Sequence, residues 1–314
     1  MMTLLATMIL LATGFIFSAC STDDTTPTPN TTSDSEISLN TEVWNFITRA
    51  TTIDNAAALQ EHSFMCYAFE DGSATQYISG STVSYAAGEW TFDDGKHYWP
   101  DAGALNFFAH LPAVLTNTYC SFDPTEYADP ANPDGYSEDC PRIVCTNLPV
   151  AITKGSDDTK ELVVAYTAAQ TKAANSAGVN LTFMHPFARV RFKLASASGT
   201  NVKVNSVTIP GVKQNGLFTF NGTVTTWTPD GADVDFVLSG NPATDDDAFY
   251  LVIPNNYGTK TLTVNATWSD WGTATKDVSA NVNFNWEVGN SYTYTLTLSK
   301  EGLIVDTSKY TEQW

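Results

Sequence analysis

Basic residues are scarce in this chain. Its 314 residues include 15 Lys and Arg against 34 Asp and Glu, which gives a formal net charge of -19. Proteins that bind nucleic acid need clustered basic side chains, and attraction to anionic lipid depends on the same positive charge. The composition therefore argues against both kinds of partner and predicts an acidic surface that keeps the protein in solution.

Sequence patterns of known catalytic and metal sites are also missing. The histidines are His62, His97, His110 and His185, and no two of them lie at metal-ligand spacing. The sequence has no Gly-x-Ser-x-Gly elbow, no phosphate-binding loop and no dinucleotide-binding glycine pattern. The acidic run Asp245–Asp247 matches no calcium-binding loop, so we interpret it as a solvated turn. We predict that the protein is not an enzyme and has no catalytic residue, metal or cofactor.

Long segments with the 3.6-residue apolar period of an amphipathic helix are absent as well. Short apolar, aromatic and β-branched segments recur instead, separated by Gly, Asn, Asp and Pro. Residues 292–298 alternate strictly, with Thr along one face. This spacing predicts an all-β protein built of β-sandwiches. The best helical candidate is Ile53–Glu61, which is rich in Ala.

The N-terminal segment is typical of an export signal. Its apolar run, Leu4–Phe17, is shorter than the roughly 20 residues that cross a bilayer as a helix, and we assign residues 1–19 to a signal peptide. The following Phe17-Ser18-Ala19-Cys20 resembles a lipobox, so Cys20 is the predicted site of lipidation, including palmitate. An ordinary secretory signal with a chance cysteine is the alternative. Residues 20–36 carry little apolar surface, which predicts a disordered tether.

The remaining sequence is long enough for two domains. We place the break at Asn175–Gly178, which gives an N-terminal domain over 37–176 and a C-terminal domain over 177–314.

The cysteines other than Cys20 permit disulfides in an oxidising compartment. Cys120, Cys140 and Cys145 flank one loop rich in Asp, Pro and Gly, and a bridge from Cys120 to Cys140 or to Cys145 is expected there. Cys66 lies in an apolar run and is expected to be a buried free thiol.

Several local patterns occur in order over most of the chain, at Lys96–Pro100, Leu105–Pro112, Glu161–Ala165, Phe183–Phe192 and Trp286–Tyr294. In sequence and in order they resemble the fimbrillin family, whose members are the major and minor subunits of type V pili. The resemblance implies two tandem transthyretin-like β-sandwich domains.

The resemblance also implies an assembly mechanism. A trypsin-like maturation protease cuts the lipoprotein precursor after an arginine, the first strand is lost, and a strand from another subunit fills the groove. Residues 37–47 have strand character, with Ile37, Leu39, Val43 and Ile47 on one face. Arg49 follows and is the first basic residue of the chain, so we predict cleavage between Arg49 and Ala50.

The C-terminal tail resembles the family's donor strand. Its candidate residues are Leu303, Ile304, Val305, Tyr310 and Trp314. The last strand of its own domain is the alternative interpretation of the tail.

Three functions remain open at this stage. The leading one is a polymerising fimbrial subunit at the cell surface, with other fimbrial subunits as partners. The second is an anchor or accessory protein that keeps its lipid in the outer membrane. The third is a monomeric surface lipoprotein that binds a glycan or a host or bacterial surface protein.

Overall fold

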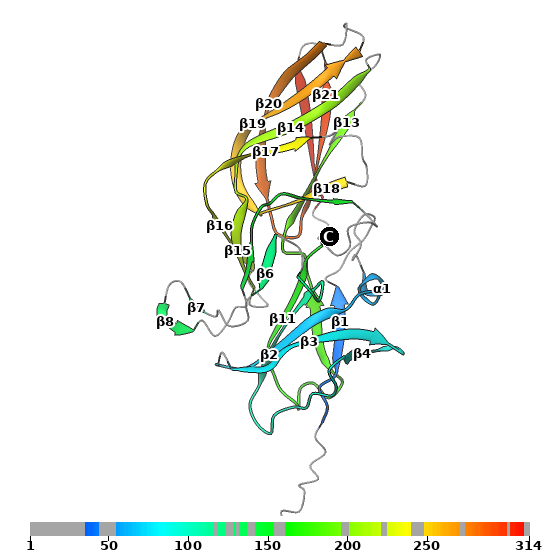
Figure 1. Cartoon of the computed structure of the whole chain (residues 1–314), viewed down its shortest axis with the longest axis vertical. Coiled ribbons are helices and arrows are strands. Elements are labelled where there is room, and N and C mark those ends of the chain that lie inside the picture. The colour runs from blue at the N-terminus through cyan, green and yellow to red at the C-terminus, as the bar shows by residue number, and fades with distance from the viewer. Residues whose placement is uncertain are drawn as a thin grey trace, which may run out of the picture. The chain divides into compact units, whose positions relative to one another are not determined.

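The computed structural model describes residues 35–43, 55–73, 75–115, 119–122, 128–129, 132–136, 142–153, 161–195, 201–220, 225–239, 248–269, 274–299 and 302–310. Most of these residues lie in strands, which confirms the predicted all-β fold class of β-sandwich type (Figure 1).

The first sheet has seven strands in the order β11-β5-β2-β3-β4-β1-β12. Their bounds are β1 Leu39–Val43, β2 Phe64–Glu70, β3 Gln76–Ala86, β4 Glu89–Phe92, β5 Leu105–Leu111, β11 Val163–Gln170 and β12 Val179–Phe183. The two outer strands also meet, because Val164 and Met184 form a bridge. The sheet therefore curls around one core, to which β2 contributes Phe64, Cys66 and Ala68.

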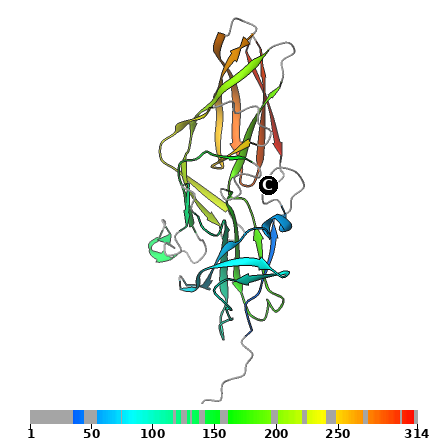
Figure 2. The ribbon, with the colours of Figure 1, turned by 45° about the vertical axis from the view of Figure 1, so that its right-hand side comes forward.

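One helix lies among the described residues, α1 at Ala56–Leu59. The Asn55 side chain accepts a hydrogen bond from the Ala58 amide at 2.9 Å, which caps the helix N-terminus. Leu59 is fully buried in the same core. The predicted helix at Ile53–Glu61 is thus present in its central part, beside β1 (Figure 2).

A second core lies between two further sheets. One has the order β10-β18-β13-β21-β22 and the other β17-β14-β19-β20. Their bounds are β10 Val150–Thr153, β13 Ala188–Ala195, β14 Val202–Val212, β17 Val234–Ser239, β18 Ala248–Val252, β19 Asn255–Trp268, β20 Ala274–Trp286, β21 Ser291–Leu298 and β22 Leu303–Tyr310. The Trp286 indole of β20 donates a hydrogen bond to the Tyr294 hydroxyl of β21 at 2.9 Å, so a buried polar pair links the two sheets.

A smaller sheet has the order β16-β15-β9-β6, with bounds β6 Cys120–Phe122, β9 Arg142–Cys145, β15 Asn215–Phe220 and β16 Thr225–Asp230. Its inner side joins a third core that also contains Phe108, Phe187 and Leu251. The short strands β7 Ala128–Asp129 and β8 Asn132–Tyr136 pair with each other.

Several strand ladders join the two sides of the predicted domain break. β12 pairs with β1, β9 pairs with β15, and β10 pairs with β18. The division into domains at 37–176 and 177–314 stays a prediction.

Candidate assembly strands

Strand β1 occupies an interior position of the seven-stranded sheet. It pairs in parallel with β12 through all five of its residues, from Leu39↔Val179 to Val43↔Phe183. On its other side the ladder with β4 is a single pair, Leu39↔Trp90. Most of its backbone pairing therefore comes from one neighbour.

The side chains of this segment alternate between core and surface. Ile37 and Leu39 are buried at 2% and 4% exposure, whereas Ser38 and Asn40 are exposed. Val43 packs against the same core as a partly buried side chain. Three of the four predicted apolar positions thus face the core, and Ile47 lies outside the described residues.

The segment before β1 is held by residues 96–99. The Ile37 amide donates to the His97 carbonyl at 2.8 Å, and Glu36 pairs with Tyr98 in an isolated bridge. The Lys96 ammonium also contacts the Glu36 carboxylate. One of the fimbrillin-like patterns therefore lies against the start of the first strand, a contact that no local sequence signal indicated.

A polar groove of about 560 Å³ borders β1 and β4. Asn40, Glu89 and Thr91 line it with exposed side chains, and Gln60 lines it with a partly buried one. The outer face of β1 is therefore accessible, while its inner face is in the core.

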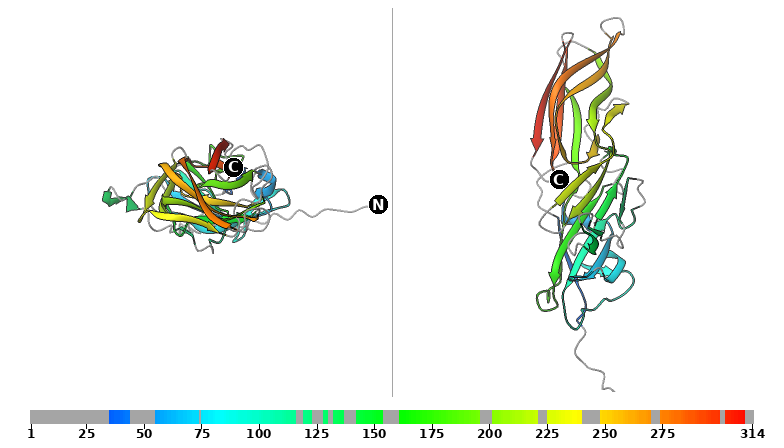
Figure 3. Two further views of the ribbon diagram at one scale, coloured as in Figure 1. Left: turned by 90° about the horizontal axis from the view of Figure 1, so that it is seen from above. Right: turned by 90° about the vertical axis from the view of Figure 1, so that its left-hand side faces the viewer.

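Strand β22 lies at the outer edge of its sheet, as Figure 3 shows for the red strand. It pairs antiparallel with β21 over eight residues, from Ser291↔Tyr310 to Leu298↔Leu303. Leu303 is buried at 8% exposure and Val305 is partly buried, but Ile304 is 63% exposed. The strand is held by a full hydrogen-bond ladder and by little apolar burial.

The C-terminal tail is thus docked on its own chain in this structure. Leu303, Ile304, Val305 and Tyr310 all lie in β22, and Trp314 falls outside the described residues. Cys20, Arg49, Ala50 and Cys140 fall outside them too, so lipidation and cleavage stay predictions.

The histidines are dispersed in the structure, and His97 and His110 contact different partners. His97 Nε2 lies 3.0 Å from Asp94 Oδ1, and His110 Nδ1 donates to the Pro112 carbonyl at 2.9 Å. Within the described ranges, no group of three or more His, Cys, Asp or Glu side chains is placed to hold a metal ion.

Two of the fimbrillin-like patterns meet inside the protein. His185 Nδ1 lies 3.4 Å from Glu161 Oε1, and both side chains are buried. No local sequence pattern indicated that His185 has an acidic partner.

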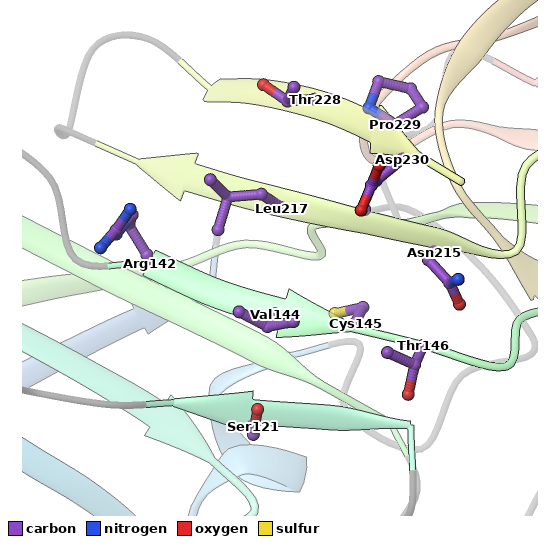
Figure 4. A pocket seen from close by; sticks show the side chains of 11 residues that line it. Ser121, Arg142, Val144, Cys145, Thr146, Asn215, Leu217, Thr228, Pro229 and Asp230 are labelled. Carbon is purple, nitrogen blue, oxygen red and sulfur yellow. The ribbon is translucent and has the colours of Figure 1, made fainter. Parts of the chain in front are cut away.

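A second hollow, of about 760 Å³, lies over the sheet β16-β15-β9-β6 (Figure 4). Its lining mixes hydroxyl and amide groups with Val144 and Leu217, and Arg142 and Asp230 carry its charges. Val144 is 46% exposed although it is a strand residue. The hollow is suited to a partly polar ligand.

No helix among the described residues has the length and apolar character needed to span a membrane.

The curled first sheet, the two-sheet sandwich and the docked C-terminal edge strand define a protein of the β-sandwich class. A fimbrillin-like family model matches residues 48–314, and the chain belongs to this family. It is therefore a fimbrial-type structural protein, and its family implies association with other fimbrial subunits at the cell surface.

Solved structures of similar proteins cover most of the chain. A candidate cell adhesion protein from Bacteroides uniformis has 17% identity and a TM-score of 0.49, with coverage of 88% of this chain and 98% of that one. A fimbrial assembly protein from Parabacteroides distasonis has 12% identity and a TM-score of 0.46, with coverage of 89% and 98%. The C-terminally truncated tip fimbrial protein Mfa3 from Porphyromonas gingivalis has 12% identity and a TM-score of 0.41, with coverage of 89% and 99%. No curated protein matches the chain.

Proposed function

We propose that this protein is a structural subunit of a cell-surface fimbrium that polymerises by protease-triggered donor-strand exchange and supports adhesion. The observation that carries the proposal is the position of β1, an N-terminal strand inserted between β4 and β12 inside a sheet. The precursor is exported as a lipoprotein through Cys20, and a trypsin-like protease then acts on it.

A cut between Arg49 and Ala50 would leave β1 attached by noncovalent contacts alone. Those contacts are the ladder with β12, the single pair with β4, the contacts of residues 36 and 37 with residues 96–98, and the burial of Ile37 and Leu39 with the packing of Val43. Its departure would uncover unpaired backbone groups on β12 and apolar pockets beneath them. Such an open slot is a template for a strand from another molecule.

Strand β22 is the proposed donor strand. Its inward face carries Leu303 and Val305 two residues apart, the same spacing as Ile37 and Leu39. We propose that these two side chains of one subunit fill the positions that Ile37 and Leu39 leave in the next. Release of β22 from β21 breaks backbone hydrogen bonds, and these form again in the new sheet. The release exposes little apolar surface.

The proposal is tested by cleavage in vitro of the chain without its predicted signal peptide. Treatment with an arginine-specific protease should produce a new N-terminus at Ala50, release the β1 fragment and yield polymers visible by electron microscopy. Arg49→Ala should block all three results. Complete cleavage at Arg49 with a product that stays monomeric contradicts the strand-exchange mechanism.

Paired variants of β22 separate cleavage from assembly. A chain with Leu303→Asp and Val305→Asp should be cut at Arg49 and remain monomeric, because charge is excluded from the apolar pockets. Ile304→Asp is the matched control, since this side chain points outward at 63% exposure, and it should polymerise like the unmodified chain.

A lipid-anchored accessory protein is the second candidate, favoured by the Phe17-Ser18-Ala19-Cys20 pattern. Native membranes would then contain the chain acylated at Cys20 and uncut at Arg49. A monomeric surface lipoprotein that binds a glycan or a surface protein is the third, and the hollow beside Val144 and Leu217 is where its ligand would bind.

A further inference from the structure

Cys120 and Cys145 lie directly opposite each other on neighbouring antiparallel strands. Cys120 begins β6 and Cys145 ends β9, and the register pairs their Cα atoms. Both are buried, at 5% and 0% exposure, and both belong to the third core. In this structure both side chains are thiols.

The hydrogen bonding of the adjacent pair specifies the geometry further. The Thr146 amide donates to the Tyr119 carbonyl at 2.7 Å, so Tyr119 and Thr146 form a hydrogen-bonded pair. Hydrogen-bonded and non-hydrogen-bonded pairs alternate along an antiparallel ladder. Cys120 and Cys145 therefore form a non-hydrogen-bonded pair, with Cα atoms about 4.5 Å apart. Disulfides accept Cα separations of about 4.4 to 6.8 Å. The two cysteines therefore meet the distance requirement without movement of the backbone.

The third described cysteine is placed differently. Cys66 is fully buried on β2 in the first core, and it pairs with Ser81 and Ala109 on its neighbouring strands. Burial raises the pKa of its thiol. Cys66 is therefore protected from oxidation, as expected from the sequence.

We propose that Cys120 and Cys145 form a disulfide bond in the exported protein. The proposal requires export to an oxidising compartment but neither cleavage at Arg49 nor polymerisation. The two thiols lose two protons and two electrons and form one S–S bond, and the disulfide of a thiol–disulfide oxidoreductase accepts both and becomes a dithiol.

The protonation state of the thiols determines when the disulfide can form. Burial, followed by the hydrogen bond with Cys145, raises the pKa of the Cys120 thiol, and thiol–disulfide exchange requires the thiolate. The bond therefore forms during folding, before the third core excludes solvent. It ties the three-residue edge strand β6 to β9, at the wall of the hollow that Cys145 lines (Figure 4).

Disulfide mapping of the exported full-length protein tests the proposal. Free thiols are blocked by alkylation in denaturant, and the chain is then digested without reduction by trypsin and by a protease that cuts before Asp. Cuts after Arg142 and before Asp123 and Asp139 place Cys120, Cys140 and Cys145 on separate peptides. The expected result is a Cys120–Cys145 linked peptide with Cys66 and Cys140 alkylated. A Cys120–Cys140 link, or an alkylated Cys120, overturns the proposal.

Thermal unfolding provides a second measurement. Reduction, or the change Cys145→Ser, should lower the unfolding temperature by about 5 °C or more, because the crosslink restrains the unfolded chain. Cys140→Ser is the matched control and should keep both the linked peptide and the unfolding temperature. A shift in Cys140→Ser equal to that of Cys145→Ser contradicts the assigned pairing.

Discussion

His185 Nδ1 lies 3.4 Å from Glu161 Oε1 where both side chains are buried, so two segments that resemble fimbrillin patterns meet at one polar contact. Glu161 precedes β11 and His185 follows β12. These strands are the two ends of the curled first sheet, and the Val164–Met184 bridge lies beside the contact. The pair thus helps to join the sheet ends.

Removal of either partner should destabilise the protein strongly. Glu161→Ala or His185→Ala leaves a buried polar group without its partner, and the expected loss is about 3 kcal/mol in the free energy of unfolding. Lys96→Ala removes an exposed ion pair with Glu36 and should cost less than about 1 kcal/mol. Urea unfolding of the three variants measures the difference. Equal losses in all three variants would show that the buried contact contributes no more to stability than the exposed ion pair.

His110 should make stability depend on pH. Burial lowers the pKa of its imidazole to about 4, and the ring lies among Tyr67, Phe108 and Phe122. The unfolded chain, with a histidine pKa of about 6.5, binds the proton more readily. This contribution to stability is therefore present above pH 6.5 and is lost as the pH falls toward 4, by about 3 kcal/mol in total.

The variant His110→Asn isolates that contribution. Asparagine retains a donor for the Pro112 carbonyl but does not titrate. Urea unfolding between pH 7.5 and pH 4 should show a flatter decline for the variant than for the unmodified chain. Parallel declines would mean that His110 is protonated equally in both states.

Gly80 should tolerate substitution far less than Gly88. Both have a positive φ, +98° and +93°, but a Cβ at Gly80 would lie 2.7 Å from the Tyr67 ring while the space at Gly88 is open. The Tyr67 ring is packed against Phe122 and cannot move away easily. We expect Gly88→Ala to cost about 1 kcal/mol of backbone strain, and Gly80→Ala at least twice as much. Thermal unfolding of the two variants tests this ratio.

Variants at Leu303 and Ile304 should show whether β22 is docked on β21 before cleavage. Leu303→Ala removes a buried side chain at 8% exposure and should cost about 2 kcal/mol. Ile304→Ala removes a side chain that is 63% exposed and should change stability by less than about 0.5 kcal/mol. Urea unfolding of the uncleaved chain compares them. If both variants unfold like the unmodified chain, β22 is not docked in the isolated subunit.

Much of the fold class was accessible from local patterns. Apolar and polar side chains alternate along residues 292–298, and these residues lie in β21 with Tyr292, Tyr294, Leu296 and Leu298 buried. The observed helix, Ala56–Leu59, is shorter than the predicted range Ile53–Glu61. Asn55 caps its N-terminus, and Leu59 is its one buried side chain. Alternation specifies which face of a strand is buried, but not which strand lies beside it.

The sequence by itself determined the all-β class and the family resemblance, because both depend on composition, local period and short sequence patterns. Only the tertiary structure decided that β1 pairs in parallel with β12, that Cys120 is opposite Cys145, and that Glu161 meets His185. Each of these contacts joins residues far apart in the sequence. Their register is set by the closure of whole sheets around shared cores, which no local sequence window records.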